Sequence, residues 1–192
     1  MLSLILSLDH KIFFLINSHH CIFGDIFFET ISWLGNGWIL VPILIIISII
    51  KIPKNKLKLF FIFTTCGFIC SSVINTQIKN VVNRERPPAY FEKQKTNATY
   101  YTQIHIVGDT LRTRSFPSGH ANTAFCGASI LSFFLGGWYW LSFILAFFVA
   151  YSRVYMGIHF PSDVVFGGIL ALIIMYFTSI LYKFALKKQR PI

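Results

Sequence analysis

The feature that most constrains this chain is a series of five apolar segments, each about as long as a bilayer is thick. A transmembrane helix needs roughly 20 apolar residues. The segments cover residues 27–50, 57–78, 118–135, 138–155 and 164–182. Because lipid offers the backbone no hydrogen-bond partners, segments of this kind cross a membrane as helices. The sequence therefore predicts an all-α, polytopic membrane helix bundle with five transmembrane helices, forming a single domain over residues 1–192.

The composition agrees with a membrane protein. Hydrophobic residues make up 55% of the chain, charged residues only 12%, and the mean hydropathy is +0.63. A soluble domain of this size needs more polar surface. The net charge of +10 does not indicate a nucleic-acid partner, because the cations lie in short connections and at the C-terminus rather than in a separate basic domain. The four cysteines show no disulfide or zinc spacing, so they indicate neither a disulfide nor a metal.

The N-terminal residues 1–20 form a shorter and more polar segment. Wound as a helix, most of their polar side chains fall within an arc of about 120°, opposite leucine and isoleucine. This pattern predicts an amphipathic helix that lies at the membrane surface. Asp9 falls on the apolar side of this helix, which the interfacial interpretation does not explain. The polar arc holds Ser3, Ser7, His10, Lys11, Asn17 and Ser18.

The distribution of lysine and arginine predicts the orientation of the bundle. The connection 51–58 and the tail 183–190 carry four cations each, and such short basic segments face the cytoplasm. Four predicted spans separate them, which is an even number, as this orientation requires. The N-terminal helix, the loop 80–117 and the connection 155–163 would then lie on the outer side. The loop 80–117 is itself basic, which indicates an anionic ligand there.

Three groups of polar residues lie at the predicted outer ends of the spans. They are Lys79 with Arg86-Pro87, then Pro117-Ser118-Gly119-His120, then Ser152-Arg153 with His159 and Asp163. Each has a structural explanation when taken alone. A lysine or arginine near a helix end often extends to the headgroups, serine and glycine often cap helices, and a histidine four residues from an aspartate can be a local pair.

The three groups together favour a phosphate site over those separate explanations. The first N–H groups of a helix at Ser118 and Gly119 would bind phosphoryl oxygens with help from the helix dipole. Cations around them would neutralise the charge that builds up in the transition state. The cations that the predicted topology places there are Lys79, Arg86 and Arg153.

These motifs resemble the signature of the type 2 phosphatidic acid phosphatase family, whose site is shared with vanadium haloperoxidases. The signature K-x6-R-P, P-S-G-H and S-R-x5-H-x3-D occurs here in order and without substitution. The resemblance implies that His159 is the nucleophile that forms a phosphohistidine, and that Asp163 orients it. It implies that His120 protonates the leaving oxygen, and that the cations with Ser118 and Gly119 bind phosphate. Many bacterial members have six spans, so six is the alternative count.

The resemblance also implies a function and a location. We expect a lipid phosphatase without metal or cofactor, in a bacterial inner membrane, with its site on the outer face. Candidate substrates are an isoprenoid diphosphate such as undecaprenyl diphosphate, phosphatidylglycerol phosphate, or the 1-phosphate of lipid A. Five further cations of the loop would hold a second phosphate or a sugar phosphate, namely Arg84, Lys93, Lys95, Arg112 and Arg114.

Two other functions would explain parts of this pattern. A non-enzymatic transporter or flippase of an anionic lipid explains the cations, but it gives no role to two histidines and an aspartate. A vanadate-dependent haloperoxidase is disfavoured, because the resemblance implies a soluble protein in that case. The sequence gives no indication of the oligomeric state.

Overall fold

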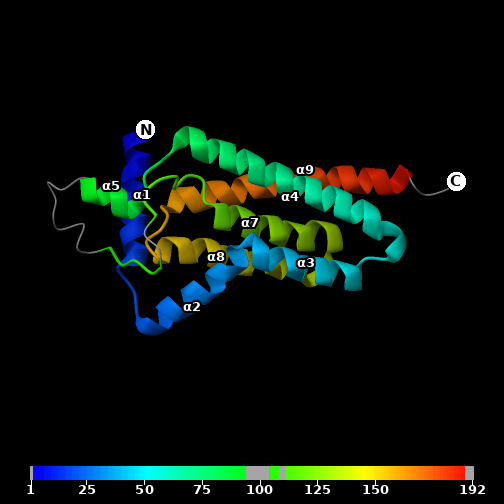
Figure 1. Ribbon diagram of the computed structural model, residues 1–192, viewed down its shortest axis with the longest axis horizontal. Coiled ribbons are helices and arrows are strands. Elements are labelled where there is room, and N and C mark those ends of the chain that lie inside the picture. Colours follow the sequence, from blue (N-terminus) through cyan, green and yellow to red (C-terminus); the bar gives the residue numbers. More distant parts are fainter. Residues whose placement is uncertain (1, 94–103, 109–110, 189–192) are drawn as a thin grey trace.

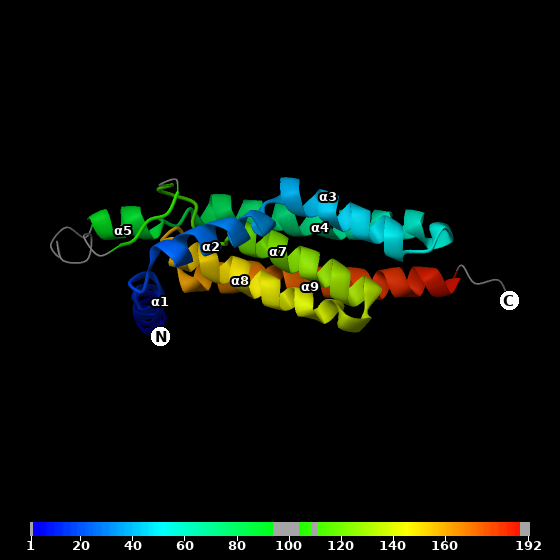
Figure 2. The ribbon, with the colours of Figure 1, turned by 90° about the horizontal axis from the view of Figure 1, so that it is seen from below.

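The computed structural model describes residues 2–93, 104–108 and 111–188. Every regular element within these ranges is helical, as the sequence predicts. Several helices run side by side along one axis and form the bundle (Figures 1 and 2). They are α3 (Gly37–Lys51), α4 (Lys54–Val82), α7 (Gly119–Ser129), α8 (Ser142–Tyr155) and α9 (Pro161–Lys188). Helix α7 contacts α3, α4, α8 and α9, so it is the central helix of the bundle.

The first predicted span, 27–50, is not one straight helix. It is divided into α2 (Ile22–Ser32), a 3-10 turn (Trp33–Gly35) and α3, and the two halves meet at 65°. The first helical segment ends at Asn36 because the backbone of this residue is extended. Asn36 is also the N-cap of α3, since its side chain accepts a hydrogen bond from the N–H of Trp38 at 2.9 Å. An asparagine in this position is a favourable N-cap.

The number of spans is smaller than predicted when it is judged by helix length and hydropathy. Among the described residues, three helices are long and apolar enough to cross a membrane, and a fourth results if α2 and α3 count as one span. The segment 118–135 falls short because it consists of α7, with 11 residues, followed by a π-helix at Ile130–Leu135. The segment 138–155 starts with a 3-10 helix at Gly137–Leu141 and continues as α8. The count of five is therefore not confirmed.

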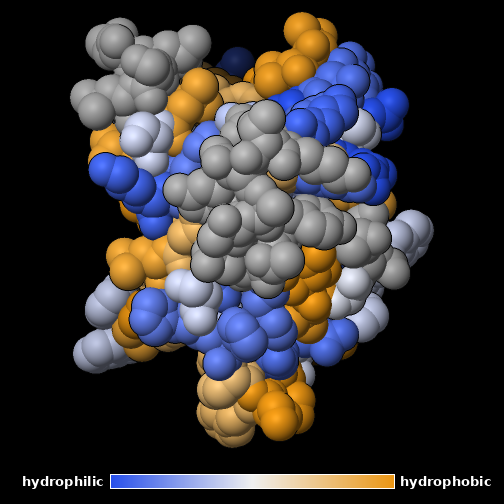
Figure 3. Space-filling model, turned by 90° about the vertical axis from the view of Figure 1, so that its left-hand side faces the viewer, coloured by the Kyte–Doolittle hydropathy of each residue, from blue (hydrophilic) through white to orange (hydrophobic). Residues whose placement is uncertain are grey.

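The two basic segments lie at the same end of the bundle. The connection between α3 and α4 and the C-terminal end of α9 are both at the right of Figure 1. Helix α1 (Leu2–Asn17) and helix α5 (Pro87–Lys93) lie at the opposite end. Helix α1 runs across the bundle axis in Figure 1 and is seen end-on in Figure 2. Hydrophilic residues gather on this end face (Figure 3).

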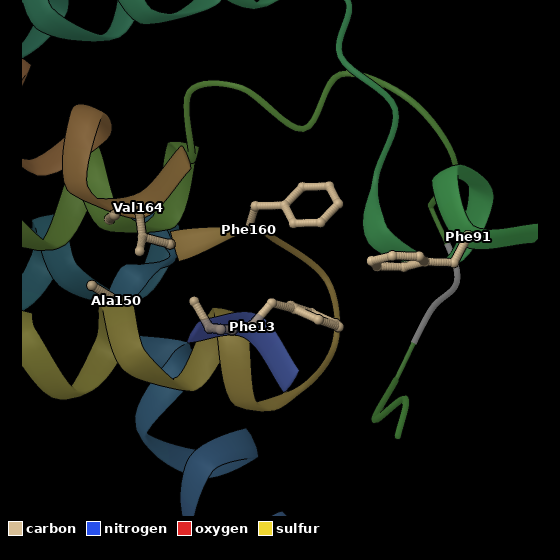
Figure 4. Packing of buried hydrophobic residues seen from close by; sticks show 7 residues of the cluster. Phe13, Phe91, Ala150, Phe160 and Val164 are labelled. Carbon is tan, nitrogen blue, oxygen red and sulfur yellow. The ribbon is translucent and has the colours of Figure 1, made fainter. Parts of the chain in front are cut away.

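A cluster of aromatic side chains fixes α1 to this end of the bundle. Phe13 of α1, Phe91 of α5 and Phe160, just before α9, turn their rings toward one another (Figure 4). The ring of Phe13 lies 5.6 Å from that of Phe160 and 6.0 Å from that of Phe91. Phe13 and Phe160 are fully buried. Aromatic pairs at these distances stabilise beyond the area they bury, so the short crossing helix has a defined position.

Gly167 permits close approach of α9 to the start of α7. A Cβ atom at Gly167 would lie 2.5 Å from the backbone oxygen of Ser118. We expect Gly167→Ala to lower the unfolding free energy by about 1–3 kcal/mol, the range for overpacking, and to lower activity as Ser118 shifts. Gly37→Ala is the matched control, because a Cβ there meets nothing within 4 Å. Thermal unfolding in detergent checks this, and equal melting temperatures for both variants would contradict it.

Candidate active site

His159 lies in the tight connection between α8 and α9. The N–H groups of Ile158 and His159 both donate to the carbonyl of Arg153 at 3.1 Å. Gly157 makes the turn possible, since its φ is +72° and a Cβ there would lie 2.4 Å from the carbonyl oxygen of His105. A positive φ of this kind favours glycine. The imidazole of His159 is only 2% exposed, so the turn holds it in one place.

One ring nitrogen of His159 is engaged by a serine and a carboxylate. Its Nδ1 lies 3.3 Å from Ser115 Oγ and 3.4 Å from Asp163 Oδ2. Ser115 Oγ donates to the same Oδ2, and the N–H of Phe160 donates to it at 2.9 Å. Carboxylate and serine both offer acceptor lone pairs, so this network assigns the proton to Nδ1. The lone pair of Nε2 is then available for attack on phosphorus.

Burial also favours the neutral form of His159. Desolvation lowers its pKa to about 3, against the opposing effect of the hydrogen bond and charge of Asp163. An uncharged imidazole is nucleophilic, whereas an imidazolium is not. His159 is therefore in its reactive protonation state at neutral pH.

Arg86 lies on the Nε2 side of the imidazole. Its Nη1 is 3.5 Å from His159 Nε2 and 3.4 Å from the carbonyl oxygen of Ile158. Its Nε donates to the carbonyl of Thr113 at 3.0 Å, and the side chain is 7% exposed. A buried guanidinium beside this nitrogen is well placed to hold a phosphoryl oxygen.

Arg153 and His120 line a cavity of about 210 Å³ next to this centre. Arg153 Nη1 donates to Ser32 Oγ at 2.6 Å, while its buried Nε has no hydrogen-bond partner among the described residues. Such an unpaired donor is costly unless a ligand uses it. Gly35 lets the 3-10 turn pack on His120, because a Cβ there would lie 2.9 Å from His120 Cβ. The cavity is also lined by Glu29, Ser32, Trp33, Asn36 and Met156.

The P-S-G-H motif begins α7, but one of its predicted donors is already used. The N–H of Ser118 donates to the carbonyl of Asp163 at 2.9 Å, so the prediction that it binds phosphate is wrong. The Ser118 side chain caps α7 by accepting from the N–H of Ala121 at 3.4 Å, which leaves its hydroxyl hydrogen as a donor. Gly119 starts the helix, so its N–H lacks an intrahelical partner. Lys79, in the last turn of α4, donates from Nζ to the carbonyl of Arg114 at 3.1 Å.

Two residues of this centre, Ser115 and Arg84, were not predicted to belong to it. Arg84 Nη1 donates to Asp163 Oδ1 and to Ser162 Oγ, both at 2.7 Å. The prediction that Arg84 holds a second phosphate is therefore wrong, because its guanidinium pairs with Asp163 instead. The unexplained position of Asp9 on an apolar helix face was the one available sign, since a buried carboxylate needs a cationic partner.

Among the loop cations that the structure describes, the others do not gather into a second phosphate site either. Arg112 pairs with Glu92, and Lys93 pairs with Glu85. Arg114 is exposed, and Lys95 lies outside the described residues. Within the described ranges, no group of three histidine, cysteine or acidic residues is arranged to hold a metal ion.

The comparison with known proteins agrees with this arrangement. A model of the PAP2 superfamily matches residues 55–187, which include all three motifs. The chain belongs to the PAP2 superfamily. It is 30% identical to an undecaprenyl-diphosphatase of Sulfolobus acidocaldarius over 141 residues, covering 73% of this chain and 62% of that protein. It is 26% identical to phosphatidylglycerophosphatase B of Bacillus subtilis over 161 residues, covering 76% of this chain and 69% of that protein.

Solved structures show the same fold. LpxE of Aquifex aeolicus superimposes with a TM-score of 0.71 at 30% identity, covering 89% of this chain and 94% of that one. A PAP2-type phosphatidylglycerolphosphate phosphatase of Bacillus subtilis also gives 0.71, at 22% identity, covering 97% and 88%. The chain spans 62% and 63% of the length of the first curated PAP2 relatives it matches.

The lowered pKa of His159 predicts how stability depends on pH. The unfolded chain binds a proton at this histidine below pH 6.5, whereas the folded state does so only near pH 3. Stability should therefore fall as pH decreases from 6.5 toward 3. We expect the melting temperature in detergent to be lower at pH 5 than at pH 7.5, and His159→Gln to reduce that difference. An equal pH dependence in both proteins would contradict the buried, neutral imidazole.

Proposed function

We propose that this protein is a metal-independent lipid phosphatase that works through a phosphohistidine at His159. The arrangement around the imidazole carries the proposal. Nδ1 is held by Ser115 and Asp163, while Nε2 points toward Arg86. A nucleophile whose second nitrogen is oriented by a carboxylate follows the general pattern of covalent catalysis. A flippase would have no use for this orientation.

The proposed reaction has two displacements at phosphorus. His159 Nε2 forms a bond to phosphorus as the bond to the leaving oxygen breaks. His120, whose protonated form is favoured by the negative charge of the bound phosphate, gives that oxygen a proton. Asp163 and Ser115 stabilise the imidazolium that results. His120 then takes a proton from water, whose oxygen attacks phosphorus, so that the N–P bond breaks and inorganic phosphate leaves. Throughout, the phosphoryl charge is balanced by Arg86, Arg153 and Lys79, with donors from Gly119 and the Ser118 hydroxyl.

We propose five spans, with α2 and α3 forming one bent span and the 118–135 segment another. The site would face the outer side of a bacterial inner membrane, and the loop 80–117 would be the outer loop that contributes to it. The position of both basic segments at the opposite end of the bundle supports this orientation, since they would face the cytoplasm. Helix α1, which crosses the bundle axis beside the site, would lie in the membrane surface.

The proposed substrate is a phosphorylated membrane lipid, because the site would open at headgroup level. The names of the relatives support a lipid phosphate or diphosphate, as in undecaprenyl-diphosphatase and phosphatidylglycerophosphatase B. The 1-phosphate of lipid A remains a third candidate.

Replacing the nucleophile tests the reaction. We expect His159→Ala to reduce phosphate release from short-chain phosphatidic acid by about 10⁴-fold or more, as when a covalent nucleophile is removed. His19→Ala is the matched control, because His19 is exposed and, among the residues that the structure describes, its ring nitrogen bonds only to the local carbonyl of Leu15. Brief incubation with a ³²P-labelled substrate and an alkaline quench should trap label on the parent protein only. Undiminished release from His159→Ala would overturn the mechanism.

A further inference from the structure

A buried carboxylate of α1 lies close to the catalytic pair. Asp9 is 5% exposed. Its Oδ2 accepts from Arg84 Nη2 at 2.7 Å and from Ser162 Oγ at 2.6 Å. Its Oδ1 accepts from the backbone N–H of Ser162 at 2.8 Å. Asp9 therefore bonds to both the residue before Asp163 in the sequence and the arginine that binds Asp163.

Arg84 connects two carboxylates with the two arms of its guanidinium. Nη2 pairs with Asp9 and Nη1 pairs with Asp163, each at 2.7 Å. The guanidinium carbon of Arg84 lies over the ring of Phe160, 4.2 Å from its centroid. A forked donor that binds two carboxylates and lies over an aromatic ring has little freedom to move. Its position is thus set jointly by α1 and by the turn that carries the nucleophile.

We propose that Asp9 and Arg84 are positioning residues, through which α1 controls the carboxylate that orients His159. This inference rests on the proposed function. The positive charge of Arg84 is shared between two carboxylates, Asp9 and Asp163. Without Asp9, the whole guanidinium charge acts on Asp163, which then stabilises the imidazolium of the phosphohistidine less well. Arg84 makes none of the described contacts with the His159 Nε2 side, so phosphate binding should not change.

The test separates turnover from binding. We expect Asp9→Asn to lower kcat about tenfold, the scale for losing a supporting hydrogen-bonded partner. The KM for short-chain phosphatidic acid and the inhibition constant of inorganic phosphate should stay at their parent values. Asp9→Glu should restore part of kcat. Glu85→Gln is the matched control, because this neighbouring carboxylate pairs only with the exposed Lys93 in the described structure, and it should behave like the parent.

A second pair of variants keeps the test valid if Asp9→Asn is poorly folded. Arg84→Lys keeps the charge but cannot reach both carboxylates as a fork, so it should lose kcat in the same way. Adding Asp9→Asn to Arg84→Gln should cause no further loss, because Asp9 acts through Arg84. An unchanged kcat in Asp9→Asn and Arg84→Lys would overturn the inference, as would full additivity in the double variant. If the parent protein released no phosphate from the lipid, the proposed function itself would be contradicted.

The cavity beside His120 supports an independent inference about the substrate. In a phosphoryl transfer the leaving oxygen departs opposite the nucleophile. His120, the proposed acid, lines this cavity together with Arg153, whereas His159 does not. The group attached to the leaving oxygen would therefore occupy the cavity.

The remaining walls of the cavity are suited to a hydroxylated group. Glu29 and Asn36 offer acceptor and amide groups, and Trp33 offers an aromatic face. Hydroxyl groups donate to carboxylates and amides, and an aromatic ring packs on the apolar face of a polyol or sugar. A carboxylate in the same space repels a second phosphate. Of the five cations predicted to hold a second phosphate, three are paired with carboxylates, namely Arg84, Lys93 and Arg112.

We infer that the preferred leaving group carries hydroxyl groups next to the phosphoester, as in a phosphorylated polyol or sugar headgroup, and not a second phosphate. This too rests on the proposed function. The expected result is a higher kcat/KM for phosphatidylglycerol phosphate than for a short isoprenoid diphosphate. Glu29→Gln should narrow that ratio about tenfold, the effect of one hydrogen bond to a charged group.

Glu92→Gln is the matched control here, since that carboxylate, on α5, pairs with Arg112 and does not line the cavity. It should leave the ratio unchanged. Faster turnover of the diphosphate by the parent protein, or an unchanged ratio in Glu29→Gln, would overturn this inference. Failure of the parent to hydrolyse either lipid would contradict the proposed function itself.

Discussion

The arrangement of the site depends on one buried carboxylate. Asp163 is fully buried, and a lone carboxylate in that position would be strongly unfavourable. Its oxygens accept hydrogen bonds from Ser115, the N–H of Phe160 and Arg84, and one of them faces His159. Each partner comes from a different part of the chain or from the turn before α9. Satisfying this carboxylate therefore fixes the loop, Arg84 and His159 relative to one another.

The backbone of the same residue extends this effect to the P-S-G-H motif. The carbonyl of Asp163 accepts from the N–H of Ser118, and the absence of a side chain at Gly167 lets the two helices approach closely enough. The first turn of α9 and the first turn of α7 are thus joined at their N-terminal ends, where both helix dipoles favour an anion. The dipoles of α7 and α9 are therefore already oriented toward the site without a bound substrate.

By contrast, two arginines of the site have no carboxylate partner among the described residues. Among the described residues, neither Arg86 nor Arg153 forms a salt bridge; both donate to carbonyl or hydroxyl oxygens. Such a concentration of positive charge opposes folding, and a phosphoryl group relieves that repulsion on binding. Arg84 differs from them because two carboxylates neutralise it. The presence of carboxylate partners thus distinguishes Arg84, which supports Asp163, from Arg86 and Arg153, which are available to bind phosphate.

The sequence by itself determined the helical class, the common end of the basic segments, and the roles proposed for His159 and Asp163. Apolar runs and short motifs carry these features, because they depend on hydropathy and on contacts between residues close in sequence. The tertiary structure decided that Asn36 bends the first span, that the Ser118 N–H is already bonded, and that Arg84 supports Asp163. These depend on partners far apart in the chain, as with Asp9 and Arg84, whose contact no spacing rule predicts. Local pattern indicated the chemistry, and packing between distant segments decided which side chains were free to perform it.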